Sequence, residues 1–316
     1  MIQGDKIQGT EGRSMNILII GGSGFIGRHL TQALLIQKRN VAILSRGKPM
    51  PAAANYEVLR WKGTDLANVL GNRKFDAVVN LAGETIGKWP WSAEHKRRVL
   101  QSRQDVSRLI TTHLAKQGFG GVYIQASGIG YYGDSHLQRI DETGPKGNDF
   151  LAEVSDLWES AAEPLISTHL ARVCFARTGL VLAENEGALP LMALPVKLFV
   201  GGKLGDGGQG VSWIHIDDIV SAYIHLIDHP TANGVYNFCA PNPISNAEFM
   251  NSLGTALERP VWLPVPKIAL EMILGEMSDL LLHGQFAVPA RLQQEGFEFK
   301  YLTSEQALMD VYGKAF

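Results

Sequence analysis

The stretch that decides the fold is "NILIIGGSGFIGRHL", residues 16–30. A short apolar run leads directly into a glycine-rich turn, and the turn opens into residues whose apolar positions recur at helical spacing. Gly21, Gly24 and Gly27 form GxxGxxG at this junction. Glycine permits the tight turn, and free N–H groups at a helix start bind phosphate. The stretch predicts the first βα turn of a dinucleotide-binding domain, with cofactor contacts at Gly21, Gly24, Phe25, Ile26, Gly27 and Arg28.

Outward from this turn, short β-rich apolar runs alternate with longer helical patterns. The runs are NILII, VAIL, YEVLRW, DAVVNLAG, GVYIQAS and ARVCFARTGLVL, and the main helix candidates are FIGRHLTQALLIQ and EHKRRVLQSRQDVSRLITTHLAKQ. Such alternation is typical of βαβ units. We therefore predict an α/β fold, a Rossmann-type doubly wound parallel sheet with a smaller mixed C-terminal domain.

The character of the chain changes after residue 182. Residues 187–210, "GALPLMALPVKLFVGGKLGDGGQG", are rich in Gly and Pro and cannot form one uninterrupted helix or central strand. We expect residues 1–14 to be a flexible polar extension, 15–182 an NADP-binding Rossmann domain, and 183–316 a smaller substrate-side domain. Segments around 211–240 are expected to return to the first domain, and Ser245 is a plausible cap for the helix that follows.

Composition limits the class of protein. The 316 residues are 45% hydrophobic and carry a formal charge of −2, with no long run of like charge. This favours a small-molecule partner and argues against a nucleic-acid surface or a membrane patch. The two cysteines, Cys174 and Cys239, form neither a disulfide framework nor a CxxC pair, and the start lacks the features of a signal peptide. We expect a cytoplasmic protein.

Cofactor choice is normally decided at the end of the second strand, where a carboxylate selects NAD. Here the chain reads "AILSRGK", residues 42–48, without an acid. Ser45 and Arg46 are suited to the 2′-phosphate of NADP(H), and Arg28 is a second candidate. The alternative is that the arginines are solvated surface charges. Further cofactor contacts are expected at Asp65, Leu66, Leu81, Ala82 and Gly83, with a loop packed on the sheet edge as the alternative for Asp65.

Several motifs together resemble the extended short-chain dehydrogenase/reductases. Their glycine signature is nearly met by "IGGSGFIG", and "SWIHIDDI" is similar to a segment of extended members. The segments "NLAGE", "SRQDVSRLI", "SGIGYYGD", "DFLAEVSDLWE", "RTGLVLAENEGAL" and "LLHGQFAVPARLQQEGFEF" resemble an atypical epimerase-like branch labelled as cell-division inhibitors (SulA-like, including the bacterial YfcH type). The resemblance implies a Rossmann domain, a small C-terminal domain and NADP(H) binding, but no particular reaction.

The usual catalytic residues of that superfamily are missing. In ordinary members a serine polarises the reacting oxygen, a tyrosine transfers the proton, and a lysine four residues later assists it. Ser127 matches the serine, which also faces the cofactor, but aligning "DFLAEVSDLWE" places Leu151 at the tyrosine and Ser155 at the lysine. None of the eight tyrosines has a lysine four residues later. The dyad is therefore absent from the whole chain.

Three replacements for the dyad stay open. Tyr131 or Tyr132 supplies a displaced phenol, Glu84 acts as a base, or no proton-transfer catalyst exists. Tyr132 better matches a structural tyrosine of the extended family, so Tyr131 is the preferred chemical candidate. Both tyrosines are alternatively packing aromatics, and Glu84 is alternatively a helix-initiating carboxylate or an ion-pair partner.

The remaining motifs are weaker. "QASGIG" lacks the first glycine of a serine-hydrolase elbow. "HIDD", with His215, is interpreted as a helix start with acidic capping, and no metal site is expected. "GGKLGDGGQG" followed by "SW" is typical of a loop that closes over a ligand, with an irregular connector as the alternative. The substrate-side candidates there are Gln209, Ser212 and Trp213.

Two functions follow as hypotheses. The first is an NADP(H)-dependent oxidoreductase or epimerase-like enzyme acting on a small polar molecule, because hydride chemistry belongs to the cofactor and the protein mainly has to position the substrate. The second is an NADP(H)-sensing or regulatory protein that turns nothing over and acts through a protein partner.

Overall fold

A seven-stranded parallel sheet forms the centre of the protein. The computed structural model describes residues 14–46, 54–63, 65–135 and 138–313. The strands run in the order β11-β7-β5-β4-β1-β2-β3, and every neighbouring pair is parallel. Their bounds are β1 Asn16–Ile20, β2 Asn40–Ser45, β3 Tyr56–Arg60, β4 Ala77–Asn80, β5 Val122–Gly128, β7 Arg172–Thr178 and β11 Gly234–Phe238. This order reverses direction beside β1, which confirms the predicted Rossmann-type α/β fold.

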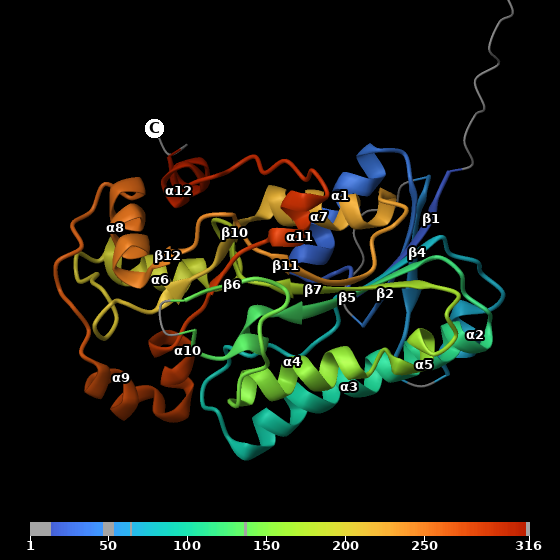
Figure 1. Ribbon diagram of the computed structural model, residues 1–316, viewed down its shortest axis with the longest axis horizontal. Coiled ribbons are helices and arrows are strands. Elements are labelled where there is room, and N and C mark those ends of the chain that lie inside the picture. The colour runs from blue at the N-terminus through green and yellow to red at the C-terminus, as the bar shows by residue number, and fades with distance from the viewer. Residues whose placement is uncertain (1–13, 47–53, 64, 136–137, 314–316) are drawn as a thin grey trace, which may run out of the picture.

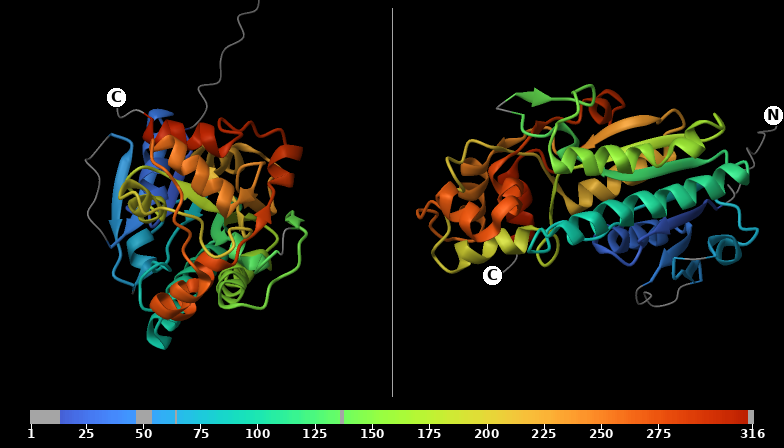
Figure 2. Two further views of the ribbon diagram at one scale, coloured as in Figure 1. Left: turned by 90° about the vertical axis from the view of Figure 1, so that its left-hand side faces the viewer. Right: turned by 90° about the horizontal axis from the view of Figure 1, so that it is seen from below.

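Helices cover both faces of the sheet (Figures 1 and 2). The helices α3 (Ala93–Lys116), α4 (Phe150–Ser160) and α5 (Glu163–Ile166) lie along one face, and α1 (Phe25–Ile36) and α7 (Ile216–Asp228) lie on the other. The short α2 (Leu66–Leu70) follows β3. The predicted helices around residues 25–37 and 94–117 are therefore present within a residue at each end.

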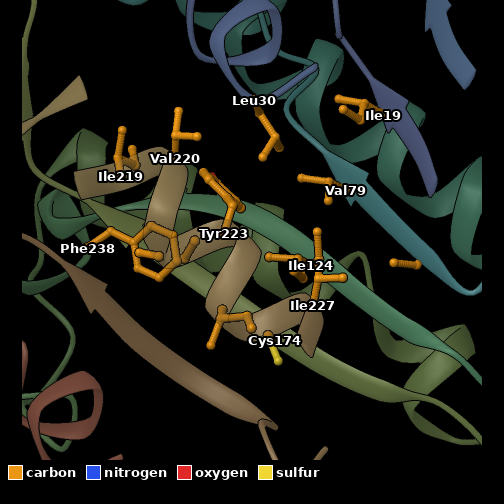
Figure 3. Close-up of a cluster of buried hydrophobic side chains, with 14 of the residues drawn as sticks. Ile19, Leu30, Val79, Ile124, Cys174, Ile219, Val220, Tyr223, Ile227 and Phe238 are labelled. Carbon is orange, nitrogen blue, oxygen red and sulfur yellow. The ribbon is translucent and has the colours of Figure 1, made fainter. Parts of the chain in front are cut away.

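The alternation of side chains along β1 explains this layering. Ile17 and Ile19 join a core cluster with α1 and α7, whereas Leu18 and Ile20 join a second cluster with α3 on the opposite face. Successive residues of a strand point to opposite faces, so a strand covered on both sides is apolar throughout. Figure 3 shows the first cluster, in which Leu30 of α1 and Tyr223 of α7 lie over the strands.

The continuous apolar pattern of residues 171–182 indicated a single strand. The structure divides this run into two strands. β7 ends just before Gly179, and a Cβ added to Gly179 would lie 2.2 Å from the carbonyl oxygen of Ser212. The chain then leaves the main sheet as β8 (Leu180–Leu182) and pairs in parallel with β10 (Trp213–His215). Close approach of two backbones, which only glycine allows, therefore marks the crossing into the C-terminal layer.

A smaller mixed assembly lies beyond the carboxyl ends of the strands, at the left of Figure 1. Its core gathers Leu182, Trp213, Phe249 and Leu308. Ser245 caps α8 with a capping box shared with Glu248, as expected. Its remaining elements, with those that join it to the sheet, are η1 Ile129–Tyr132, β6 Arg139–Ile140, α6 Leu189–Lys197, β9 Gly210–Val211, β12 Ile244–Ser245, α8 Asn246–Ala256, α9 Lys267–Leu274, η2 Gly275–Ser278, α10 Asp279–Leu282, β13 Phe286–Ala287, α11 Ala290–Gln294 and α12 Ser304–Tyr312.

The segment between residues 211 and 240 connects the two parts. β10 belongs to the C-terminal layer, whereas α7 packs beside α1 and β11 takes the edge of the main sheet. The division at residue 182 stays a prediction. Within the described ranges, no helix combines the length and the apolar character needed to span a membrane.

Candidate functional site

The glycine turn after β1 is shaped by backbone contacts. Gly21 has φ +78°, and a Cβ on Gly27 would lie 2.5 Å from the Gly21 carbonyl oxygen. A Cβ on Gly22 would lie 2.4 Å from Cγ2 of Ile43. Gly24 is the N-cap of α1 and supplies no side-chain cap, so the first N–H groups of this 12-residue helix are not occupied by a capping side chain. These features fit the pyrophosphate of a dinucleotide.

The end of β2 meets this turn through a pair of hydroxyls. Ser45 is buried, and its hydroxyl forms a short hydrogen bond with that of Ser23. Arg46 is exposed at the next position. No carboxylate stands at this strand end, so the local chemistry matches the prediction of a 2′-phosphate rather than a free ribose hydroxyl.

Arg28 is engaged elsewhere. Its guanidinium donates to the carbonyl of Ser23 at 2.7 Å and forms a short ion pair with Glu186, from the loop after β8. The expected role as a second phosphate contact does not agree with this placement, because the ion pair already occupies the guanidinium. Arg28 instead ties the loop of residues 183–188 to the glycine turn.

The other predicted cofactor residues differ in what they expose. Phe25 and Ile26 are half-buried and pack against the sheet core, so only their backbone faces the turn. Leu66 is buried in the opposite core cluster, so its side chain is not offered to a ligand, whereas the exposed Asp65 accepts a hydrogen bond of 2.6 Å from Asn68. At the end of β4, Leu81 and Ala82 are half-buried and Gly83 is exposed.

Glu84 is held against α3. Its N–H donates to the hydroxyl of Ser102 at 2.9 Å, and its carbonyl accepts from the guanidinium of Arg103 at 2.9 Å. Burial lowers the pKa of Arg103 to about 10, and the charge of Glu84 opposes that change. A Cβ on Gly83 would lie 3.0 Å from Cζ of the same arginine. The backbone of Glu84 therefore joins the segment after β4 to α3, and the role of its side chain as a base stays a prediction.

Ser127 stands at the centre of a buried polar cluster. The strand register pairs it with Arg177 of β7, so both side chains leave the same face of the sheet. The Ser127 hydroxyl donates to Oε1 of Glu159 at 2.7 Å, and Glu159 comes from the last turn of α4. Arg177 donates to both oxygens of that carboxylate, from Nε and from a terminal nitrogen, at 2.8 Å each.

The pair is well shielded from water, since the side chain of Arg177 is 4% exposed and that of Glu159 is 12% exposed. Burial by itself lowers the pKa of the Arg177 guanidinium, but the hydrogen bonds and charge of Glu159, with Tyr132, together outweigh burial and raise it. Arg177 therefore stays positively charged beside an ionised carboxylate.

Two tyrosines cover this cluster. The guanidinium carbon of Arg177 lies 3.4 Å from the ring centroid of Tyr131 and 5.0 Å from that of Tyr132. Tyr132 is buried, and its hydroxyl donates to Oδ1 of Asn237 at 2.7 Å. Burial raises the pKa of Tyr132 to about 12. Tyr132 therefore has the structural role expected for it, whereas the half-buried Tyr131 lies nearer to solvent.

Leu151 and Ser155 occupy the positions where the resemblance placed a tyrosine and a lysine. Leu151 packs so closely on Gly130 that a Cβ there would lie 2.9 Å from the Cβ of the leucine. Ser155 is buried, and its hydroxyl donates to the carbonyl of Gly128 at 3.4 Å. Both residues thus support the turn between β5 and Tyr131.

An open pocket of about 920 Å³ lies between the start of α3 and the start of α4. Lys96, Lys146 and Phe150 are among its lining residues. The hydrogen bond to Asp156 raises the pKa of Lys146. The N–H of Gly147, another lining residue, donates to the carbonyl of Tyr131 at 2.8 Å, so the backbone of Tyr131 lies next to the pocket wall. A small polar molecule fits a space of this size.

The predicted substrate-side residues do not line this pocket. Trp213 is fully buried in the C-terminal core. The hydroxyl of the buried Ser212 donates to the carbonyl of Gln285 at 2.7 Å and accepts from the N–H of Ala287 at 2.8 Å. The side-chain amide of Gln209 donates to the carbonyls of Leu204 and Leu281. Gln209 and Ser212 thus join C-terminal segments to one another, and substrate contact by the three side chains stays a prediction.

The sequence interpretation missed Arg177 and gave Glu159 no role. A signal was present, since Arg177 is a charged residue inside the apolar strand of residues 172–178. A buried charge requires a partner, but the partner lies on a helix 18 residues earlier in the chain. "HIDD" begins α7 as expected, although the cap is the ring of His215, which accepts from the N–H of Asp217 at 3.1 Å.

Comparisons with known proteins agree with this geometry. Residues 17–156 match the NAD dependent epimerase/dehydratase family, and residues 265–311 match a domain of unknown function, DUF1731. The chain is 38% identical over 307 residues to "Epimerase family protein SDR39U1 homolog, chloroplastic" of Arabidopsis thaliana, covering 93% of this chain and 86% of that protein. It is 36% identical over 297 residues to "Epimerase family protein YfhF" of Bacillus subtilis, covering 93% and 97% respectively.

A solved structure is also similar. The human epimerase family protein SDR39U1 (isoform 2), determined with NADPH, is 31% identical to this chain, with a TM-score of 0.84 over 95% of this chain and all (100%) of that one. The NADPH in that structure agrees with the prediction of NADP(H) made from Ser45 and Arg46.

Proposed function

We propose that this chain, which belongs to the NAD dependent epimerase/dehydratase family, is an NADP(H)-dependent oxidoreductase or epimerase-like enzyme acting on a small polar molecule. The observation that carries the proposal is the cluster of Ser127, Glu159, Arg177 and Tyr131 at the carboxyl ends of β5 and β7. Ligands of open α/β sheets bind outside these strand ends. In this proposal the cluster takes over the role of the Tyr–Lys dyad, which the chain lacks.

The chain's own residues fit the cofactor. The glycine turn and the uncapped start of α1 would hold the pyrophosphate, and Ser45 with Arg46 would hold the 2′-phosphate. When bound, the nicotinamide supplies hydride-accepting or hydride-donating chemistry. The protein has to position a substrate carbon and to move one proton.

Ser127 and Glu159 form the proton path in this proposal. A carboxylate accepts hydrogen bonds only, so the hydroxyl hydrogen of Ser127 points to Glu159 and its lone pairs point away from it. Ser127 is thereby oriented to accept a hydrogen bond from a substrate hydroxyl. In the oxidation direction the substrate's hydroxyl proton passes to Oγ of Ser127 as the Ser127 proton passes to Glu159. Arg177 holds the carboxylate in place throughout.

Tyr131 is the second group in the proposal. Its ring centroid lies 3.4 Å from the guanidinium carbon of Arg177, a cation–π contact that holds the ring beside the Ser127 cluster. From there its hydroxyl would donate to the oxygen of the reacting carbon. The pocket bordered by Lys96, Lys146 and Phe150 would receive the remainder of the substrate.

Hydride transfer is tested with NADPH carrying tritium at C4, on each face in turn, incubated with the pure protein and a small-molecule extract of its host. Label in a new metabolite supports an enzyme and reveals the face used. Label that stays on tightly bound cofactor contradicts net reductase activity on anything in that extract. The Ser127→Ala protein serves as the matched control, because it retains the glycine turn but breaks the proton path.

Cofactor selectivity has its own test. Arg46→Ala is expected to weaken NADPH binding about tenfold and to leave NADH binding unchanged, since a charge-assisted hydrogen bond to the 2′-phosphate is lost. Fluorescence titration measures both affinities. Arg98→Ala is the control, because that guanidinium pairs with Glu94 on the exposed surface of α3. Equal losses in both cofactors for Arg46→Ala would remove this part of the proposal.

One observation favours the alternative, an NADP(H)-sensing protein without turnover. Leu151 and Ser155 replace the proton-transferring pair by side chains that only pack. If a cellular phenotype survives Ser127→Ala and Tyr131→Phe but is lost with Arg46→Ala, binding rather than catalysis carries the function. The narrower likeness to proteins labelled as cell-division inhibitors belongs with this alternative.

We also place the protein in a reducing, cytoplasmic compartment. Cys174 and Cys239 are free and buried, and burial raises the pKa of Cys174 to about 12. Both thiols are therefore inert hydrophobic groups.

A further inference from the structure

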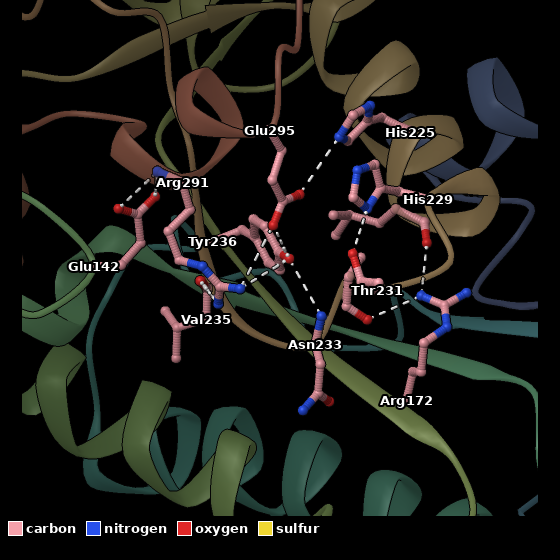
Figure 4. Close-up of polar contacts among 12 residues, drawn as sticks. Glu142, Arg172, His225, His229, Thr231, Asn233, Val235, Tyr236, Arg291 and Glu295 are labelled. Carbon is pink, nitrogen blue, oxygen red and sulfur yellow. Dashed lines mark hydrogen bonds and ion pairs between the residues drawn. The ribbon is translucent and has the colours of Figure 1, made fainter.

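Three potential metal ligands meet at the edge of the sheet, away from the site described above. His225 lies in the last turn of α7, His229 is the C-cap of that helix, and Glu295 is the C-cap of α11 (Figure 4). Each residue offers one ligand atom, and these atoms all lie within 4.8 Å of one another. The cluster stands where α7 ends and β11 begins, whereas Ser127 and the glycine turn lie at the carboxyl ends of the strands.

Two atoms of this cluster are buried without a partner that satisfies them. Within the described ranges, Nε2 of His225 and Oε2 of Glu295 are shielded from solvent and make no hydrogen bond. They face each other at 3.5 Å. A buried polar atom left unsatisfied costs about 1–3 kcal/mol, so the arrangement calls for a group that binds both atoms. A cation between them satisfies the nitrogen and the oxygen together.

The surrounding side chains orient the three ligands. The hydroxyl of Tyr236 donates to Oε1 of Glu295 at 2.7 Å, and a terminal nitrogen of Arg291 lies 3.6 Å from the same oxygen. These contacts occupy Oε1 and leave Oε2 for an ion. The hydroxyl of Thr231 lies 3.3 Å from Nδ1 of His229, which leaves Nε2 of that ring for an ion. Such outer contacts typically fix ligands of metal sites.

The helix itself favours a cation at this place. Both histidines lie at the carboxyl end of α7, where the helix dipole places partial negative charge, and Arg172 donates to the carbonyls of Leu226 and Ile227 in the same turn. Histidines four residues apart lie on one face of a helix, so the spacing in "HLIDH", residues 225–229, brings both rings to the same side. Their ring centroids are 5.0 Å apart.

We propose that His225, His229 and Glu295 bind one divalent transition-metal ion of the zinc class. Two imidazoles and a carboxylate form a ligand set that zinc uses, with a fourth position for water. Zinc–ligand bonds of about 2.0–2.1 Å place tetrahedral ligand atoms roughly 3.3 Å apart. Nε2 of His225 and Oε2 of Glu295 are already 3.5 Å apart, so only the longer separations, which are at most 4.8 Å, have to shorten, by up to about 1.5 Å, through rotation of half-buried side chains. A bound metal ion would link α11 to α7 across the edge strand β11.

The proposed site differs from the expectation from the sequence, which included no metal site. The sequence search considered only the histidine of "HIDD", and Glu295 stands 66 residues beyond His229 in the chain. The proposal does not depend on the proposed enzymatic function, because none of its residues touches the cofactor turn or the Ser127 cluster.

The test uses the full-length chain freed of any histidine tag. Metal-stripped protein is dialysed against Zn²⁺, and bound zinc is counted by mass spectrometry, while calorimetric titration gives the affinity. We expect one tight zinc ion per chain and a rise in the melting temperature. His225→Ala and Glu295→Gln are each expected to weaken binding at least a hundredfold, and His229→Ala at least tenfold.

His283→Ala is the matched control, because His283 also faces a carboxylate, that of Asp279 at 3.8 Å, but belongs to no group of three potential metal ligands among the described residues. It is expected to bind zinc like the natural protein. NADPH titration of every variant verifies folding, since the cofactor site lies elsewhere. Zinc binding that is unaffected by both His225→Ala and Glu295→Gln in folded protein, or no bound zinc at all, overturns the proposal. Bound Co²⁺ with a tetrahedral absorption spectrum in the natural protein, lost in His229→Ala, supports it independently of affinity.

Discussion

Arg177 donates two hydrogen bonds of 2.8 Å to the carboxylate of Glu159, and the same carboxylate accepts a hydrogen bond from the hydroxyl of Ser127. The cation of this pair comes from β7 and the carboxylate from α4, so the pair joins the sheet to the helix layer. Replacing one member of a buried pair leaves the other as an unpaired charge. Structure and proposed chemistry therefore depend on the same two residues.

Glu159→Gln should destabilise the protein by about 3 kcal/mol, because the Arg177 charge is left buried without its counter-ion. Urea unfolding at neutral pH measures the loss. Glu94→Gln is the control, since Glu94 pairs with Arg98 in solvent at 2.6 Å and should contribute less than about 0.5 kcal/mol. Equal effects of the two substitutions would show that the buried pair does not contribute to stability in this way.

Substitutions at the two neighbouring tyrosines should distinguish a catalytic role from a structural role. Tyr131→Phe is expected to lower tritium transfer by roughly a hundredfold or more, the usual contribution of a hydrogen-bond donor to the reacting oxygen, with little change in stability. Tyr132→Phe removes a buried hydrogen bond to Asn237 and should cost about 1–2 kcal/mol of stability while leaving transfer near its original rate. The reverse pattern would reassign the chemistry to Tyr132.

Gly27→Ala should weaken NADPH binding at least about tenfold, because the added methyl group meets backbone atoms of Gly21 and Gly22 that cannot move freely. Fluorescence titration of NADPH gives the affinity. Gly87→Ala has no heavy atom within 4 Å of the added Cβ and should bind like the natural protein. Unchanged binding in Gly27→Ala would contradict the assignment of the turn to the pyrophosphate.

His113 provides a prediction of pH dependence. Burial, with the charge of Lys116, lowers the pKa of His113 in the folded protein. In the unfolded chain a histidine has a pKa of about 6.5. As the pH falls past that value, the unfolded state therefore binds more protons than the folded state. The free energy of unfolding should therefore fall as pH falls through this region, and His113→Gln should lose that part of the slope. Unfolding at pH values on both sides of the window measures it, with the exposed His283→Gln as control.

Local sequence patterns correctly predicted much of the fold. The alternation of apolar residues in "NILII" and the helical spacing that follows depend on neighbours a few residues away, and the chain folds there as predicted. The glycine turn is local at position 27, where an added Cβ would meet Gly21 and Gly22, whereas Gly21 is favoured by its φ of +78° and also by the backbone of Leu81 from the distant strand end. The capping box of Ser245 and Glu248 is another contact of this kind.

What the sequence by itself determined is thus the doubly wound sheet, its glycine turn and the lack of any tyrosine followed by a lysine four residues later. The tertiary structure alone decided how polar groups distant in the chain are paired. It paired Arg28 with Glu186 and Arg177 with Glu159, and it buried Ser212 and Trp213. The physical reason is that backbone preference acts between neighbours, whereas a buried charge or amide is satisfied by whichever partner the packed layers bring within about 3 Å.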